Sequence, residues 1–76
     1  MPTFFTIDGI RICFYFDDHN PPHFHALFAE YEVVIKIKTL ETMEGSLPKR
    51  KMKKALEFAG KNQDLLMEIW DKMQGN

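Results

Sequence analysis

The fold follows from one stretch of the sequence, Phe14-Tyr15-Phe16-Asp17-Asp18-His19-Asn20-Pro21-Pro22-His23-Phe24-His25-Ala26. It contains all three histidines of the chain, two acids and a Pro-Pro pair, and it lies between two runs rich in apolar residues. Consecutive prolines lack the backbone N–H that a sheet ladder needs, and the residue before a proline is restricted to extended or turn conformations. We therefore predict a loop over residues 18–22 that joins two strands.

The residues before this loop predict a β-hairpin. Asp8-Gly9 is a strong signal for a two-residue hairpin turn, and the run 3–7 before it is β-branched and aromatic. After the turn, apolar and other residues alternate with the period of a strand. One face of that strand would carry Ile10, Ile12, Phe14 and Phe16, and the other Arg11, Cys13 and Tyr15.

The residues after the loop predict a second hairpin, with strands over residues 23–29 and 31–38. Phe24, Ala26 and Phe28 would share the inward face with Tyr31, Val33, Ile35 and Ile37. The outward face of the whole sheet would then carry Arg11, Tyr15, His23, His25, Glu32 and Lys36.

The remainder predicts a polar connector over residues 39–45 and two amphipathic helices. Ser46 is a suitable N-cap, Pro48 suits a first turn, Gly60 suits a helix end, and Asn62 can cap the second helix. Apolar residues recur at helical spacing in both segments. They are Met52, Ala55, Leu56 and Ala59 in the first helix, and Leu65, Leu66, Ile69, Trp70 and Met73 in the second.

These elements predict an α+β fold in the order β-β-β-β-α-α. A four-stranded antiparallel sheet of two hairpins would be covered on one face by the two helices and left open on the other. With 76 residues the chain predicts a single domain over 1–76, with β hairpins in 1–38 and a two-helix part in 46–74.

Composition narrows the class of protein. A hydrophobic fraction of 45% predicts a folded globule, and the single cysteine, Cys13, excludes an internal disulfide framework. No apolar run has the roughly 20 residues that a membrane span requires, and Met1-Pro2-Thr3 lacks the basic start of a signal peptide. We expect a cytoplasmic protein that does not associate with membranes.

Charge is divided unevenly along the chain. Residues 1–45 carry three bases and seven acids, whereas residues 46–76 carry seven bases and four acids. The densest part is a run of five bases in six positions, which are Lys49, Arg50, Lys51, Lys53 and Lys54. Cations at a helix start oppose the helix dipole, which favours a functional reason such as phosphate binding. We predict a nucleic-acid contact there, and the alternative is a solvated helix face.

The histidines form the candidate catalytic or metal site. On a strand, positions i and i+2 project to the same side, so His23 and His25 can converge on one ion, with His19 or Asp17 reaching in from the loop. Such ligands suit zinc, manganese or iron, and three protein ligands leave a position for water. General acid–base chemistry by His19, His23, His25 and Asp18 is a second reading. A rigid turn whose histidines only bond the backbone is the alternative without chemistry.

The open sheet face predicts a contact surface. Arg11, Tyr15 and Lys36 on this face are residue types suited to a protein interface, and Tyr15 between cations also suits stacking on single-stranded nucleic acid. We favour the protein interface, either with a partner protein or in a homo-oligomer.

Several motifs together resemble a family of small prokaryotic proteins, the domain of unknown function 4160. They are Met1-Pro2, then Tyr15-Phe16-x-Asp18-His19-x-Pro21-Pro22-His23-Phe24-His25, then Tyr31-Glu32, and finally Glu44-Gly45-Ser46-Leu47-Pro48-x-Arg50. The resemblance implies a bacterial or archaeal cytoplasmic protein, often encoded beside another small protein in arrangements like toxin–antitoxin modules. The resemblance supplies neither an activity nor catalytic residues that could be assigned to this chain.

The sequence thus favours a small binding or regulatory module, with a partner or itself at the open sheet face and nucleic acid at Lys49–Lys54. The alternative is a metal-dependent hydrolase or nuclease centred on His19, His23 and His25 with Asp17 or Asp18, and with zinc or manganese as the metal. A metal-free ribonuclease that uses a histidine pair with a lysine or arginine is the third hypothesis. Whether the protein is an enzyme stays open at this level.

Overall fold

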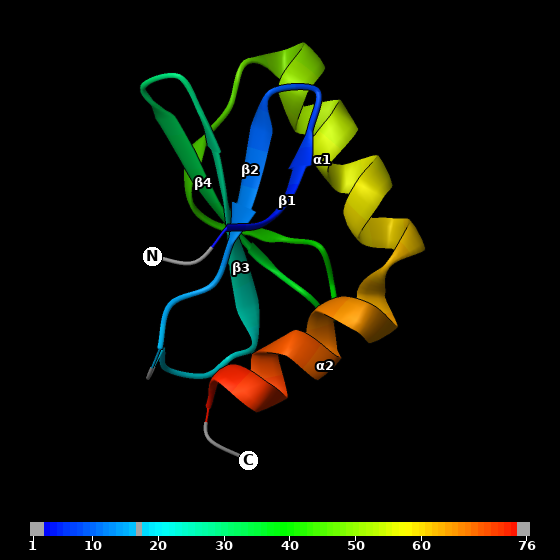
Figure 1. Cartoon of the computed structure of the whole chain (residues 1–76). Helices are drawn as coiled ribbons and strands as arrows, with labels where there is room; N and C mark the ends of the chain where they lie inside the picture. The colour runs from blue at the N-terminus through cyan, green and yellow to red at the C-terminus, as the bar shows by residue number, and fades with distance from the viewer. Residues whose placement is uncertain (1–2, 17, 75–76) are drawn as a thin grey trace.

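The computed structural model describes residues 3–16 and 18–74 of the chain (Figure 1). Five strands form one sheet in the order β1-β2-β3-β4-β5, and every neighbouring pair is antiparallel. Two helices follow the strands. The elements are β1 (Thr3–Ile7), β2 (Ile10–Cys13), β3 (His23–Phe28), β4 (Tyr31–Lys36), β5 (Thr42–Ser46), α1 (Lys49–Lys61) and α2 (Gln63–Met73). The α+β class and the two helices are confirmed.

The prediction of four strands is wrong, because residues 42–45 of the expected connector, together with Ser46, form the edge strand β5 beside β4. All five residues of β5 are exposed, so the strand lacks the apolar alternation that would reveal it. Gly45 permits the pairing: its φ is +75°, and a Cβ there would collide with the carbonyl oxygen of Glu32. The sheet therefore extends to Ser46, beyond the predicted hairpin segment 1–38.

The first hairpin forms as predicted around Asp8-Gly9. Both residues have positive φ, +54° and +81°, as the tight primed turn of a two-residue hairpin requires. The inward orientation is confirmed for Ile10, Ile12 and Phe14, which are buried. It is wrong for Phe16, whose exposed fraction is 70%. Strand β2 ends at Cys13, so the alternation of a strand no longer holds at position 16.

The core lies between the sheet and the helices. Ile12, Phe24 and Ile35 from three neighbouring strands are fully buried, and the helices cover them with Ala59 and Leu66 among others. Burying each large apolar side chain contributes roughly 1.5–3 kcal/mol. Most of the buried apolar side chains therefore lie on the face of the sheet that the helices cover. The opposite face, which carries the histidines of β3, is directed away from α1.

The helix boundaries differ in detail from the prediction. Helix α1 begins after Pro48 without a side-chain cap, because the expected cap residue, Ser46, belongs to β5. Gly60 does not end the helix, which continues to Lys61. Asn62 lies at the N-cap position of α2 as expected, but its side-chain amide donates to the carbonyl of Phe58 (2.8 Å) at the end of α1. The junction is thus held by contacts with α1.

Helix α2 crosses the end of β3 that carries His23. The indole of Trp70 lies 5.0 Å from the imidazole of His23, centroid to centroid. The rest of the outward face, with Arg11, His25 and Glu32, belongs to the sheet side that α1 does not cover (Figure 1). No helix among the described residues is long and apolar enough to cross a membrane.

Candidate metal centre

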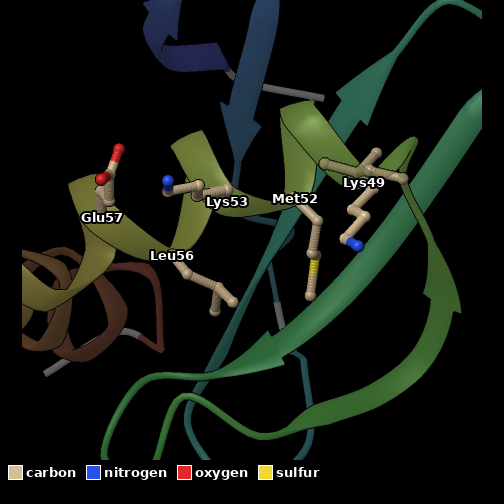
Figure 2. A pocket seen from close by; sticks show the side chains of 6 residues that line it. Lys49, Met52, Lys53, Leu56 and Glu57 are labelled. Atoms are coloured by element: carbon tan, nitrogen blue, oxygen red, sulfur yellow. The ribbon is translucent and has the colours of Figure 1, made fainter.

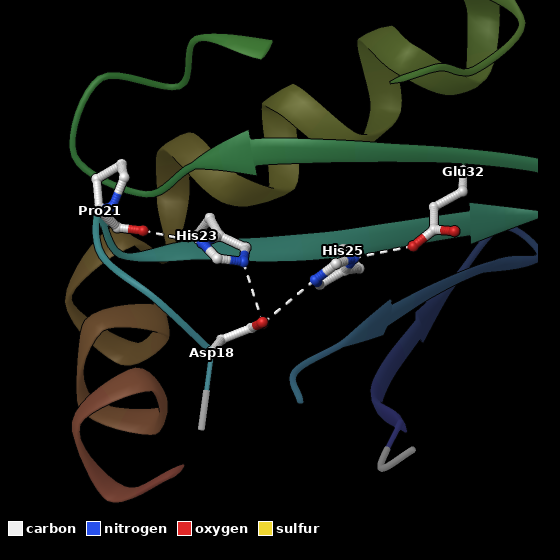
Figure 3. A network of polar contacts seen from close by, with 5 residues as sticks. All are labelled: Asp18, Pro21, His23, His25 and Glu32. Carbon is white, nitrogen blue, oxygen red and sulfur yellow. Dashed lines mark hydrogen bonds and ion pairs between the residues drawn. The ribbon is translucent and has the colours of Figure 1, made fainter. Parts of the chain in front are cut away.

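Three side chains with metal-binding atoms meet where the β2–β3 loop returns to the sheet (Figure 3). Asp18 lies in that loop, His23 begins β3, and His25 follows two residues later. Strand parity places both imidazoles on one face, as the sequence predicted. Across the sheet, His25 is paired with Cys13 on one side and Val34 on the other. These two neighbours are buried and compact, so they leave room for the ring of His25 above the sheet.

The two rings converge on a single carboxylate oxygen. Oδ2 of Asp18 lies 3.0 Å from Nε2 of His23 and 3.3 Å from Nε2 of His25. One ligand atom from each of the three residues lies within 4.8 Å of the other two. The side chain of Asp18 is 25% exposed, while those of His23 and His25 are 9% and 13% exposed. The cluster is therefore largely withdrawn from water, and Asp18 is its most exposed member.

The Nδ1 atom of each imidazole, which faces away from Asp18, forms a hydrogen bond with an oxygen atom. Nδ1 of His23 donates to the carbonyl of Pro21 (2.8 Å), and Nδ1 of His25 donates to Oε2 of Glu32 (2.9 Å). A carbonyl and a carboxylate can only accept, so each Nδ1 carries the proton of its ring. In the neutral rings Nε2 then presents a lone pair toward Asp18. This is the arrangement in which outer-sphere oxygens orient metal-binding histidines.

The approach of both Nε2 atoms to the Asp18 oxygen is energetically favourable only when positive charge lies among these three atoms. An Nε2 lone pair facing a carboxylate oxygen is repulsive, and the cluster has two such contacts. The repulsion is removed when each ring takes up a second proton, or when one cation lies among the two nitrogens and the oxygen. A bound cation would interact favourably with both nitrogens and with the oxygen. It would also keep each ring in the tautomer that its hydrogen bond to Pro21 or Glu32 already selects.

Aromatic contacts fix the orientation of both rings. Trp70 lies against His23, and the phenol ring of Tyr15 meets His25 edge-on with centroids 4.2 Å apart. Burial raises the pKa of Tyr15 above its usual 10, and the negative charge of Glu32 contributes in the same direction. The phenol therefore stays neutral beside the cluster across the physiological range.

A family model described as Domain of unknown function (DUF4160) matches residues 9–71. The chain belongs to this family. No curated protein and no solved structure matches the chain. The DUF4160 match spans Asp18, His23, His25 and Glu32, so the whole cluster lies inside the family's segment.

The DUF4160 cluster differs from the predicted ligand set in its loop member. Asp18, expected among the acid–base candidates, takes the third position. His19 is exposed and is not among the three clustered side chains. Asp17 lies outside the described residues. Glu32 was placed on the correct face, but its role as partner of His25 was missed. The only signal in the sequence was the strand parity that puts both residues on one face, whereas the structure supplies the register in which Glu32 pairs with Leu27 and lies diagonally across from His25.

The basic segment of this DUF4160 chain does not act as one patch. Nζ of Lys51 donates to the carbonyl of Asp8 (2.7 Å), lies 3.3 Å from the Asp8 carboxylate, and sits 4.5 Å above the ring of Phe28. Lys51 therefore joins α1 to the first hairpin. The other four bases are exposed and form no ion pair with the described residues; they are Lys49, Arg50, Lys53 and Lys54.

The predicted interface residues occupy the outward sheet face as expected. Arg11 is exposed, whereas Tyr15 and Lys36 are half-buried. Nζ of Lys36 lies 3.7 Å from Oε1 of Glu41, an exposed contact. Such pairs contribute roughly 0–1 kcal/mol, so the contact leaves Lys36 available to other partners.

Proposed function

We propose that this protein is a small metal-binding module in which Asp18, His23 and His25 hold one divalent transition ion. One observation carries the proposal: both Nδ1 atoms donate to oxygens, which turns both Nε2 atoms toward the same oxygen of Asp18. A rigid turn needs only the contact of His23 with the Pro21 carbonyl, and a cation between the rings and Asp18 would explain why both Nε2 atoms converge as well.

The spacing between the Asp18 oxygen and each of the two histidine nitrogens fits such an ion. Metal–nitrogen and metal–oxygen distances near 2.0–2.2 Å place neighbouring ligand atoms of a tetrahedral zinc site roughly 3.3 Å apart. The two nitrogen–oxygen distances here are 3.0 and 3.3 Å. Two imidazoles and a carboxylate suit zinc, and they also suit manganese. The ion would link the β2–β3 loop to the start of β3.

Three protein ligands also support hydrolysis as the chemistry of the site. An ion held in this way retains a position for water, and it lowers the pKa of that water toward neutrality. Asp18 and the two histidines would hold the ion, while Glu32 and the Pro21 carbonyl would orient the rings. The alternative of a metal-dependent hydrolase therefore rests on the same three side chains.

Isothermal calorimetry with zinc and manganese on protein stripped by a chelator tests the binding. We expect one site per chain, and loss of that site in His25→Ala. His19→Ala is the matched control, because it removes an imidazole of the same loop outside the cluster, and it should bind normally. Equal weakening by the two variants, or no heat of binding in the unmodified protein, would refute the proposal.

The chemistry is tested with the metal-loaded protein and bis(p-nitrophenyl) phosphate as a generic diester. Release of nitrophenol that depends on the added metal and disappears in His25→Ala supports a hydrolase. Metal binding without any turnover would restrict the function to binding.

A second candidate function, contact with nucleic acid, is supported by the four exposed bases of α1 that form no ion pair with the described residues. Four phosphate contacts predict that log K falls with log salt concentration with a slope of roughly −3 to −4. Fluorescence anisotropy with labelled DNA and RNA over a salt series measures this slope. Arg50→Glu with Lys54→Glu should reduce affinity on every sequence, and a flat salt response would exclude this function.

A further inference from the structure

A groove of about 610 Å³ runs beside α1 (Figure 2). Its apolar surface comes from Leu47, Met52 and Leu56, and the last two point from the helix toward the strands. Lys49 and Lys53 lie one helical turn apart at its rim, and neither forms an ion pair with a described residue. Glu57 lies one turn further along. The groove therefore offers an apolar ridge flanked by two cations.

Helix α2 presents the complementary pattern on its own exposed side. Leu65 is 40% exposed, and Ile69, one turn later, is partly buried and packs against the core with part of its side chain. Asp64 and Glu68 precede these two residues by one position each and are exposed. The one ion pair of this group joins Glu68 to Lys72 at 3.6 Å, with both side chains more than half exposed, and so it is weak. This side of α2 is an apolar ridge flanked by two anions.

We propose that this protein forms a homodimer through its helices, in which Leu65 of one copy enters the α1 groove of a second copy. Asp64 and Glu68 would then face Lys49 and Lys53. Both charge pairs and both apolar pairs are spaced four residues apart, so their ridges repeat with the same helical pitch. Any helix has this spacing, so the opposite charges of the two ridges are what favour a second copy of the chain as the occupant.

The proposed contact is compatible with two-fold symmetry. Each copy carries both the groove and the α2 ridge, so a two-fold axis would form both contacts at once and close the dimer. The contact involves the helices, whereas the Asp18–His23–His25 cluster lies on the sheet face that α1 does not cover. Trp70 of α2, which meets His23, lies on the buried side of that helix and not in the proposed contact. Dimerisation should therefore not depend on the metal proposed above, and a chelator should not change it.

Charge reversal tests the proposal on the full chain. Sedimentation and light scattering at low salt should give about twice the chain mass of 9.0 kDa. Lys49→Glu with Lys53→Glu should give a monomer, and so should Asp64→Lys with Glu68→Lys. An equimolar mixture of the two variants should recover a dimer of mixed composition, because every reversed pair becomes attractive again.

Arg50→Glu with Lys54→Glu is the matched control, since it makes the same change of charge on α1 outside the groove. This variant should remain a dimer. Circular dichroism should show that all variants are folded, because every substituted side chain is exposed. A monomeric unmodified chain at millimolar concentration would overturn the proposal. It would also be overturned by a dimer that survives either reversal, or by a mixture that stays monomeric.

Discussion

At the scale of single residues, Glu32 connects the candidate metal centre to the sheet. It accepts a hydrogen bond from Nδ1 of His25 and so presents Nε2 to the cluster. Partners of this kind commonly change metal affinity by 10–100-fold when removed. Glu32 is itself exposed, so its replacement need not disturb the core.

We therefore expect Glu32→Ala to weaken zinc binding by about 10-fold or more. Glu32→Gln should weaken zinc binding less, because the amide oxygen of the glutamine can still accept the hydrogen bond from Nδ1 of His25. Glu30→Ala, an exposed acid on the adjoining turn, is the control and should leave affinity unchanged. Calorimetry measures all three. A Glu32→Ala protein with unaltered affinity would show that His25 is oriented by other contacts.

Tyr15 provides a second prediction at this scale. Burial, Glu32, Cys13 and Asp18 raise its pKa above 10, against a smaller lowering by Arg11. Ultraviolet titration of metal-free protein should show one phenol that ionises above pH 10, and Tyr15→Phe should remove it. A folded-state pKa above the unfolded value contributes stability that is complete below pH 10 and is lost as pH rises through the folded value. A titration curve that Tyr15→Phe leaves unchanged above pH 10 would contradict this prediction.

At the scale of elements, the edge strand β5 depends on one glycine. Gly45 has positive φ and lies where any Cβ would strike the Glu32 backbone, whereas Gly60 lies inside α1 with its nearest neighbour at an ordinary 3.7 Å. The same substitution should therefore have opposite effects at the two positions.

Gly45→Ala should lower the free energy of unfolding by at least about 1 kcal/mol, because it adds strain and a clash. Gly60→Ala should raise it by about 0.5–1 kcal/mol, because alanine favours the helix. Urea denaturation measures both, and equal effects would argue against the described pairing of β4 and β5.

The connection between α1 and the first hairpin depends on Lys51. Lys51→Ala removes a charged hydrogen bond and a cation–π contact, so it should cost about 1 kcal/mol. Lys54→Ala, on the exposed side of the same helix, should change stability by less than about 0.5 kcal/mol. Thermal or urea unfolding of the two variants side by side distinguishes them. If Lys51→Ala lowered the free energy of unfolding by no more than Lys54→Ala does, the contacts of Lys51 with the first hairpin would not contribute to stability.

Elements with strong alternation or special turns were predictable. The Asp8-Gly9 hairpin and the common side of His23 and His25 follow from turn chemistry and strand parity. Strand β5 was not, because an exposed polar edge strand has no apolar period. Nor could periodicity choose between Asp18 and His19, since the loop backbone decides which side chain turns inward. The end of β2 at Cys13, which exposes Phe16, is likewise set by that loop.

At the scale of the whole molecule, charge follows the architecture. Asp18 and Glu32 lie on or beside the outward sheet face, while the four exposed bases of α1 lie on the helical side. A cation bound at Asp18 would reduce the excess of negative charge on the sheet side. It would also join the β2–β3 loop to β3, so metal binding and folding should be linked.

Zinc at 100 times its Kd should therefore raise the free energy of unfolding by about 2.7 kcal/mol. For a domain of this size the corresponding rise in Tm is roughly 10–20 °C. Differential scanning calorimetry with zinc and with a chelator measures the rise, and His25→Ala should abolish it. An unchanged Tm despite measured binding would mean that the ion also binds the unfolded chain.

The packing of Trp70 against His23 gives this molecule a built-in optical probe. The chain has one tryptophan, and its indole lies 5.0 Å from a ring of the proposed site. Any charge placed on that ring, by a proton or by an ion, alters the surroundings of the indole. Emission intensity should therefore change on occupancy without an attached dye, and paramagnetic manganese should dim it differently from diamagnetic zinc.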